Sequence, residues 1–162
     1  MDEQVQDDHS SVSIFHFETQ SQGQGDRRQL LPLAKNALKK LRSTRHPNIL
    51  RFLEGSESET AVWIITEPVE PLSELLEKGE ELWSQESKVY GLLHLVTGVG
   101  FLNTSGTVHG GVRKETTWVT KGGGWKLGGF EVASKLEEQD AVLWVSSKRL
   151  YSYTFSLRRE LM

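Results

Sequence analysis

The pattern of apolar and polar positions in the N-terminal half predicts antiparallel strands packed on one helix. Residues 12–17 (VSIFHF) alternate or run apolar, as a β-strand does. Apolar residues then recur at helical spacing over residues 30–41, where Pro32 is tolerated because it falls in the first turn. Residues 48–53 and 61–66 indicate two further strands, joined by the polar turn EGSESE. A hairpin packed on one helix is therefore expected.

The pattern becomes more helical beyond Pro68 and Pro71. Residues 73–82 (SELLEKGEEL) indicate a short acidic helix or turn. The apolar positions of the longer helix that follows share one face, and they are Val89, Leu92, Leu93, Val96, Val99 and Leu102. Residues 117–120 and 125–127 then predict a second hairpin, whose turn is supplied by KGGG.

Both ends of the chain lack a clear periodic pattern. Residues 1–11 are acidic and polar, which predicts disorder. Residues 135–162 contain apolar and aromatic stretches without a clean period, so we expect an irregular tail. The predicted domain therefore covers residues 12–134.

Composition narrows the classes of protein to which the chain can belong. Its 162 residues are enough for one domain with a hydrophobic core. The absence of cysteine excludes disulfides, thiolate zinc sites and a cysteine nucleophile. A net charge of -3 provides no overall attraction to nucleic acid or anionic membranes. No apolar run approaches the roughly 20 residues that cross a bilayer, and the acidic N-terminus lacks the pattern of a secretory signal. We therefore expect a cytoplasmic protein without a membrane span.

Several motifs occur in the order found in protein kinases, from the third strand of a kinase to its metal-binding loop. They are VSIF, RHPNIL, ITE, VHGGVRKET and WKLGGF. The longer runs LLPLAKNALKKLRSTRHPNIL, ITEPVEPL and WKLGGFEV resemble more specifically the SCY-like pseudokinases, a family that includes a cytoplasmic tRNA-export factor. This resemblance covers about residues 11–134. It implies an α+β, protein-kinase-like fold in truncated form, with a partial small lobe, a hinge near Glu67 and Pro68, and the start of a helical lobe.

Family members normally have two earlier strands, the rest of the helical lobe and a set of helical repeats. This sequence shows none of these parts, so the resemblance implies an uncovered strand edge and an uncovered apolar face. We therefore expect a marginally stable or association-prone chain, in which the tail is the candidate cover for part of that face.

The resemblance also indicates that kinase chemistry is lost. A kinase uses a strand lysine for the phosphates, a helix glutamate to orient that lysine, and an aspartate that accepts the hydroxyl proton. It also uses an asparagine and a second aspartate to hold magnesium. The corresponding positions here are, in that order, Phe15, Ala37, Gly111, Thr116 and Gly129. We therefore expect a pseudokinase and not an enzyme, with no catalytic, metal-binding or cofactor-binding residues and no cofactor.

The remaining polar and aromatic residues of these motifs have simpler interpretations. His109 keeps its kinase-like position and is interpreted as a core residue that supports the adjoining loop. Trp63, Trp118 and Trp125 fit strand or core packing better than base stacking. A kinase of unorthodox mechanism would need displaced acids, and the candidates are Glu115, Glu131 and Asp140. None of them lies at the required spacing.

The function that the resemblance implies is scaffolding or adaptor work in intracellular trafficking or tRNA export, with protein partners from that machinery. A local cluster of positive charge near the end of the first helix is the candidate partner surface, formed by Lys39, Lys40, Arg42 and Arg45. Together with Arg158 and Arg159 it supports an alternative, direct contact with tRNA or another RNA. A solvated helix face is the simplest interpretation of the same cluster. A kinase that binds ATP in an unorthodox way is the second alternative.

Overall fold

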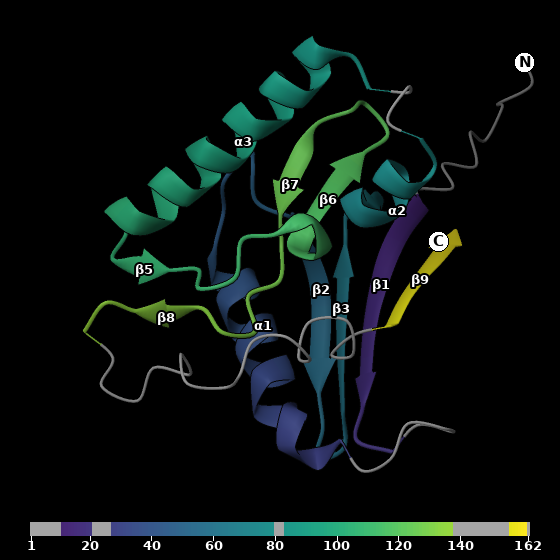
Figure 1. Ribbon diagram of the computed structural model, residues 1–162. Coiled ribbons are helices and arrows are strands. Elements are labelled where there is room, and N and C mark those ends of the chain that lie inside the picture. The colour runs from purple at the N-terminus through teal and green to yellow at the C-terminus, as the bar shows by residue number, and fades with distance from the viewer. Residues whose placement is uncertain (1–10, 21–26, 80–82, 138–155, 162) are drawn as a thin grey trace, which may run out of the picture.

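The N-terminal half of the protein is an antiparallel sheet with one helix across it. The computed structural model describes residues 11–20, 27–79, 83–137 and 156–161. Its largest sheet has the strand order β2-β3-β1-β9, and helix α1 packs on one face (Figure 1). The bounds of these elements are β1 Ser11–Glu18, β2 Phe52–Glu57, β3 Ala61–Thr66, β9 Ser156–Leu161 and α1 Leu31–Ser43, which follows the 3-10 turn η1 Arg28–Leu30.

Strand β1 is an inner strand of this sheet, and six of its eight residues are buried. It pairs with β3 on one side and with β9 on the other, so that Phe15 lies opposite both Ile64 and Leu157. Helix α1 turns one apolar stripe toward the sheet, made of Leu33, Ala34, Ala37, Leu38 and Leu41. The strand and the helix predicted from the N-terminal pattern are both confirmed.

The C-terminal half consists of helices and short strand pairs. Its helices are α2 Leu72–Glu77, α3 Gln85–Thr104 and the 3-10 turn η3 Lys114–Thr116. Its strands are β4 Val69–Pro71, β5 Thr107–Val108, β6 Thr117–Thr120, β7 Trp125–Leu127 and β8 Ser134–Lys135. One small sheet has the order β4-β6-β7, and β5 pairs with β8. The predicted hairpin at residues 117–127 is confirmed as β6 and β7.

The segment between α1 and β2 joins the two halves. The Leu50 N–H donates to the Leu127 carbonyl at 2.9 Å, and the Leu127 N–H donates to the Asn48 carbonyl at 2.8 Å. Ile49 and Leu127 are fully buried in the core cluster that contains residues of both halves. Because burying an aliphatic side chain contributes about 1.5–3 kcal/mol, this contact stabilises the relative placement of the halves.

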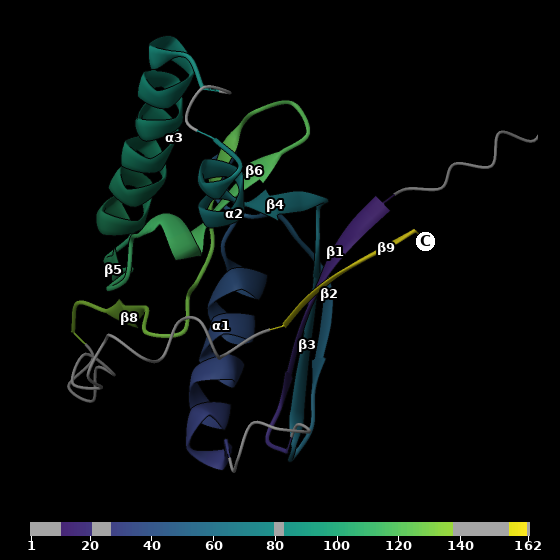
Figure 2. The same ribbon diagram turned by 45° about the vertical axis from the view of Figure 1, so that its right-hand side comes forward.

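Helix α3 was predicted correctly as a helix, but its apolar face does not form its main contact. Its buried residues are Gly91, Gly98 and Leu102. Trp125 lies so close to Gly91 that a Cβ there would be 2.2 Å from the ring. The exposed fractions of the aliphatic side chains on the other side reach 69% at Val96. Figure 2 shows α3 at the outer margin of the molecule, which agrees with this exposure. Small residues let the helix backbone approach the β7 strand, so the N-terminal part of the apolar stripe faces outward while Val99 and Leu102 contact the core.

The tail differs from the prediction of an irregular segment. Lys135 lies in β8, and residues 156–161 form β9, which pairs antiparallel with the outer side of β1. The expected uncovered edge of that strand is therefore wrong. The sequence SLRREL contains no β-branched or aromatic residue, so no local signal favours a strand there, and pairing with β1 determines its conformation. Residues 1–10, where disorder was predicted, and residues 138–155 lie outside the described residues.

The structure also bears on membrane topology. Among the described residues, even the longest helix, α3, is not apolar enough over its length to cross a bilayer.

Candidate functional site

The positions that correspond to kinase catalytic residues converge at the junction of the two halves. Phe15 from β1, Ala37 from α1 and Gly129 from the loop after β7 line one cavity. Its other walls are Leu41, Leu50, Ile64, Trp118 and Phe130. The remaining space is about 30 Å³, roughly the volume of a single water in the liquid. Ligand pockets usually offer about 300–1,000 Å³. This cavity is therefore too small for a nucleotide.

Aromatic rings fill the space that a phosphate-binding lysine would need. Phe15 is 7% exposed, and its ring meets the Trp118 ring edge to face with a centroid distance of 4.8 Å. Phe130, at 1% exposed, closes another wall. Edge-to-face pairs of this kind add about 0.5–1.5 kcal/mol beyond area burial. The interpretation of Trp118 as a packing residue is confirmed, but its position inside the catalytic cleft was not foreseen.

The segment at residues 67–69, which joins β3 to β4, is held by hydrogen bonds within the protein. The Ser13 hydroxyl on β1 accepts from the Val69 N–H at 3.0 Å and donates to the Val69 carbonyl at 3.3 Å. Ser13 is completely buried. Nearby, the Glu67 carboxylate accepts from the Arg51 N–H at 2.8 Å and lies 3.4 Å from the Lys126 ammonium. A ligand at Val69 would have to displace the Ser13 hydroxyl.

His109 supports the loop that follows β5, as predicted. Its Nε2 atom lies 2.8 Å from the Gly128 carbonyl, while its Nδ1 atom accepts from the Gly111 N–H at 3.2 Å. Nε2 therefore carries the proton and donates it. Burial lowers the pKa of the imidazole to about 4, although the Gly128 bond partly opposes that shift. The ring is neutral at physiological pH and packs edge-on against Phe130 at 4.9 Å.

Gly111 and Thr116 shape the same loop. The Thr116 hydroxyl lies 2.8 Å from the Gly111 carbonyl and 3.0 Å from the Arg113 carbonyl, and it accepts from the Arg113 N–H at 3.0 Å. The Thr116 side chain also contacts Gly129, which has φ of 74°. The hydroxyl is thus committed to backbone groups instead of a metal. No group of three histidine, aspartate or glutamate side chains suited to a metal occurs in the described part of the chain.

Asn36 on α1 binds the loop that carries Phe130. Its amide nitrogen lies 3.3 Å from the Phe130 carbonyl, 2.9 Å from the Glu131 carbonyl and 3.0 Å from the Ala133 carbonyl. Sequence reasoning did not single out this residue, because an asparagine on a predicted helix gives no sign of its partners. The contact fixes the loop against the helix.

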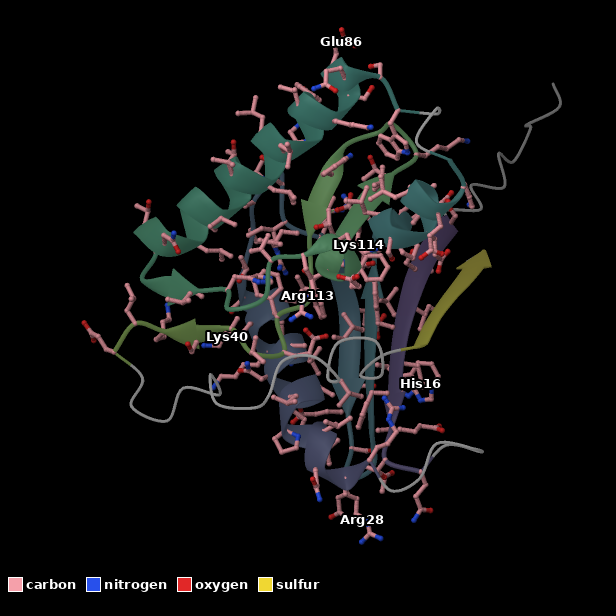
Figure 3. The ribbon with its side chains drawn as sticks, in the orientation of Figure 1. His16, Arg28, Lys40, Glu86, Arg113 and Lys114 are labelled. Carbon is pink, nitrogen blue, oxygen red and sulfur yellow. The ribbon has the colours of Figure 1, made fainter. Side chains whose placement is uncertain are left out.

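Two of the three candidate displaced acids lie in the described part of the chain, and they differ in burial. Glu115 is exposed, and Asp140 lies outside the described residues. Glu131 is 8% exposed, and its Oε2 atom has no hydrogen-bond partner among the described residues. Burial raises the pKa of Glu131 to about 7, although the positive charge of Arg113 opposes the rise. Figure 3 shows Arg113 near the middle of the molecule, where the halves meet.

The four cations of the candidate partner surface differ in their contacts, since two of them pack against Phe52. Arg42 donates to the Gly55 carbonyl at 2.8 Å, and its guanidinium lies 5.6 Å from the Phe52 ring centre. Arg45 lies at the same distance from that ring and donates to two carbonyls at the end of α1. Lys40 is half-buried, and Lys39 is exposed. Two of the four cations are therefore engaged in packing the helix against β2.

The fold and the filled cleft together define a protein-kinase-like domain. The family described as "Protein tyrosine and serine/threonine kinase" matches residues 6–153. Because this match covers most of the chain, the chain belongs to the protein kinase family. Relatives whose names contain scy1 or SCY1-like place it among the SCY-like members, which confirms the expected family and the α+β kinase-like fold.

Three relatives illustrate the similarity. "Probable inactive serine/threonine-protein kinase scy1" of Dictyostelium discoideum is 37% identical over 134 residues, which are 82% of this chain and 15% of that protein. "SCY1-like protein 2" of Homo sapiens is 31% identical over 120 residues, 64% of this chain and 13% of that protein. "Protein-associating with the carboxyl-terminal domain of ezrin" of Mus musculus is 31% identical over 103 residues, 63% of this chain and 14% of that protein. The chain thus spans 15% or less of the length of each of these relatives.

Proposed function

We propose that this chain is a catalytically inactive kinase-like domain that acts as a cytoplasmic scaffold or adaptor in intracellular trafficking or tRNA export. The observation that carries the proposal is the packing of Phe15, Trp118 and Phe130 around the position of the nucleotide phosphates. A cleft filled in this way retains the fold while it removes phosphate and magnesium contacts. Support for the adaptor role comes from the relative whose name states association with the carboxyl-terminal domain of ezrin.

ATP with magnesium is expected to leave the melting temperature unchanged. A ligand at about 100 times its Kd would add about 2.7 kcal/mol of stability, which corresponds to several degrees for a domain of this size. Thermal denaturation with millimolar ATP, in magnesium and in EDTA, measures the effect. The Phe15→Lys variant is the matched control, since a restored lysine alone should create no binding while Trp118 fills the cavity. A saturable, magnesium-dependent rise for the unmodified chain would overturn the inactive assignment.

Charge reversal is expected to destabilise the protein at Arg42, which packs against β2, but not at the exposed Lys39. Arg42→Glu should lower the free energy of unfolding by about 1 kcal/mol or more, because the Gly55 bond and the Phe52 contact are lost. Lys39→Glu should change it by less than about 0.5 kcal/mol, as exposed substitutions usually do. Urea denaturation measures both values.

The same Lys39→Glu variant tests the adaptor surface. If partners dock on α1, Lys39→Glu reduces their capture from cytosolic extract at unchanged stability. Lys121→Glu is the control, because Lys121 is also exposed but lies in the turn between β6 and β7. Equal losses with Lys39→Glu and Lys121→Glu would mean that overall charge drives capture and that this surface does not.

The RNA alternative is weaker than its sequence pattern indicates. Counterion release on RNA binding requires cations that are free to meet phosphates. Arg42 and Arg45 are held on Phe52 and on backbone carbonyls. We therefore retain protein partners as the proposed ligands of the chain.

A further inference from the structure

The outer edge of β1 is covered by a strand from far along the chain. Strand β9 pairs with β1 over six residue pairs, from Ser11 opposite Leu161 to His16 opposite Ser156. Both ribbon views place the two strands side by side (Figures 1 and 2). β1 is the stronger member of the pair, since it contains Val12, Ile14 and two phenylalanines. The outer edge of β1 supplies backbone donors and acceptors along these six residues.

Strand β9 is a weak occupant of this strong edge. None of its six residues is β-branched or aromatic, and those are the residue types that favour strands. Favourable cross-strand side-chain pairs contribute about 0.2–1 kcal/mol each relative to pairs of alanines. Opposite Ile14 and Val12, β9 instead places Arg158 and Glu160. A segment with better strand formers at those two positions would pair more strongly with β1.

Because β9 belongs to the same chain, it competes for the edge at a high effective concentration, which a free segment must overcome. Twenty residues separate Lys135 at the end of β8 from Ser156 at the start of β9. Tethering within one chain gives β9 an effective concentration at this edge on the order of millimolar. A free segment at micromolar concentration must then pair about 100 to 1,000 times more tightly than β9 does. Two improved cross-strand pairs at up to about 1 kcal/mol each give roughly a 30-fold gain. A peptide with these two improvements should therefore compete with β9 from tens of micromolar upward.

We propose that the outer edge of β1 is a docking edge for an extended peptide segment of a partner protein, and that β9 occupies this edge within the chain until that segment displaces it. The backbone ladder supplies affinity, as in other cases of strand addition. The register selects apolar residues opposite Phe15 and Ser11, four positions apart, and β-branched residues opposite Ile14 and Val12. This docking edge holds whether or not the chain acts in trafficking or tRNA export.

A cysteine pair can lock β9 in place, since the chain has no cysteine of its own. Val12 and Glu160 are directly opposed, so Val12→Cys with Glu160→Cys should form a disulfide within one chain. Val12→Cys with Arg159→Cys is the matched control, because neighbouring residues of a strand point to opposite faces and the second pair cannot bridge. Non-reducing gels of dilute protein distinguish bridged monomers from bridged dimers.

The probe is a fluorescent peptide with the sequence of residues 154–162 in which Arg158→Ile and Glu160→Thr improve strand pairing. Fluorescence anisotropy should show that it binds the reduced Val12→Cys, Glu160→Cys protein at least tenfold more tightly than the oxidised protein. The reduced and oxidised forms have the same sequence, so a difference in their peptide affinity reports only whether β9 can leave the edge. A peptide of the same composition in scrambled order should not bind either form.

Three results would overturn the docking edge. Equal binding to the oxidised and reduced forms places the peptide elsewhere, and no binding to the reduced form below millimolar peptide removes the site. Bridging only between chains would mean that β9 exchanges between two copies, so that the occupant is another copy of this chain. A bridge in the Arg159→Cys control but not in the Glu160→Cys protein would contradict the register itself.

Discussion

Gly129→Asp is expected to lower the free energy of unfolding by roughly 3 kcal/mol, although it would restore an acid at the kinase metal position. Gly129 has φ of 74°, a region that side chains with a Cβ rarely adopt. A Cβ there would lie 2.4 Å from the Thr116 Cγ2 atom and 2.6 Å from its Cβ atom. The backbone strain and the overlap add to each other. Urea denaturation of the variant measures the loss.

Gly123→Asp separates these two contributions. Gly123 has φ of 80°, but no described atom lies within 4 Å of a Cβ at that position. We expect this substitution to cost only about 1 kcal/mol, the backbone part of the penalty. If both variants lose the same free energy of unfolding, the overlap with Thr116 is relieved by a shift of that side chain that does not lower stability. If the larger loss at Gly129 is observed, restoring Gly111→Asp and Gly129→Asp together cannot rebuild a kinase site around the present Thr116.

Glu131→Gln is expected to stabilise the protein above neutral pH. Burial raises the pKa of Glu131 from its ordinary 4.5 to about 7, so the folded form keeps a proton that the unfolded form releases between these values. The stability that this group contributes is complete below pH 4.5 and is lost as the pH rises through 7. At about 1.4 kcal/mol per pKa unit the full loss is roughly 3 kcal/mol. A neutral glutamine has no such loss.

His109 changes the stability with pH in the opposite direction to Glu131. Burial lowers its pKa from 6.5 to about 4, so the unfolded form binds the proton first as the pH falls. Its contribution is complete above pH 6.5 and is lost as the pH falls toward 4. Between pH 4.5 and 6.5 the slopes from Glu131 and His109 oppose each other, and these two groups together leave stability nearly constant. Glu131→Gln should expose the His109 slope, with stability rising over that interval.

Urea denaturation at several pH values from 4.5 to 8 tests this pair of shifts. Glu115→Gln is the control, because it makes the same exchange at an exposed position. A Glu131→Gln profile parallel to that of the unmodified protein would show that Glu131 is already ionised in the folded state.

Local patterns predicted those parts of the structure that local forces determine. The alternation in residues 12–17 and the helical spacing in residues 30–41 each reflect one buried face, and both elements formed as expected. Family resemblance assigned Phe15, Ala37 and Gly129 to kinase catalytic positions, and the structure brings these three residues to the lining of one cavity. Aligned positions of a known fold thus predict proximity even where the chemistry has changed.

Features that depend on distant partners could not be predicted in this way. β9 has no strand signal of its own and forms because β1 offers an edge. Helix α3 carries an apolar stripe, yet the contact with Trp125 is made by Gly91, which has no side chain to reveal it. Likewise, the burial of Glu131 depends on the fold around it, and its sequence neighbours gave no indication of a raised pKa.

The bonds from Asn36 to three carbonyls of the loop at residues 130–133 have a consequence for allosteric control. Active kinases are regulated by repositioning this helix and this loop between two arrangements. Here one amide holds both together, and Phe15 and Trp118 pack beside them. These contacts stabilise one arrangement of α1 relative to the loop. A partner that binds next to α1 would meet a preformed surface, and its affinity would not be reduced by a conformational equilibrium.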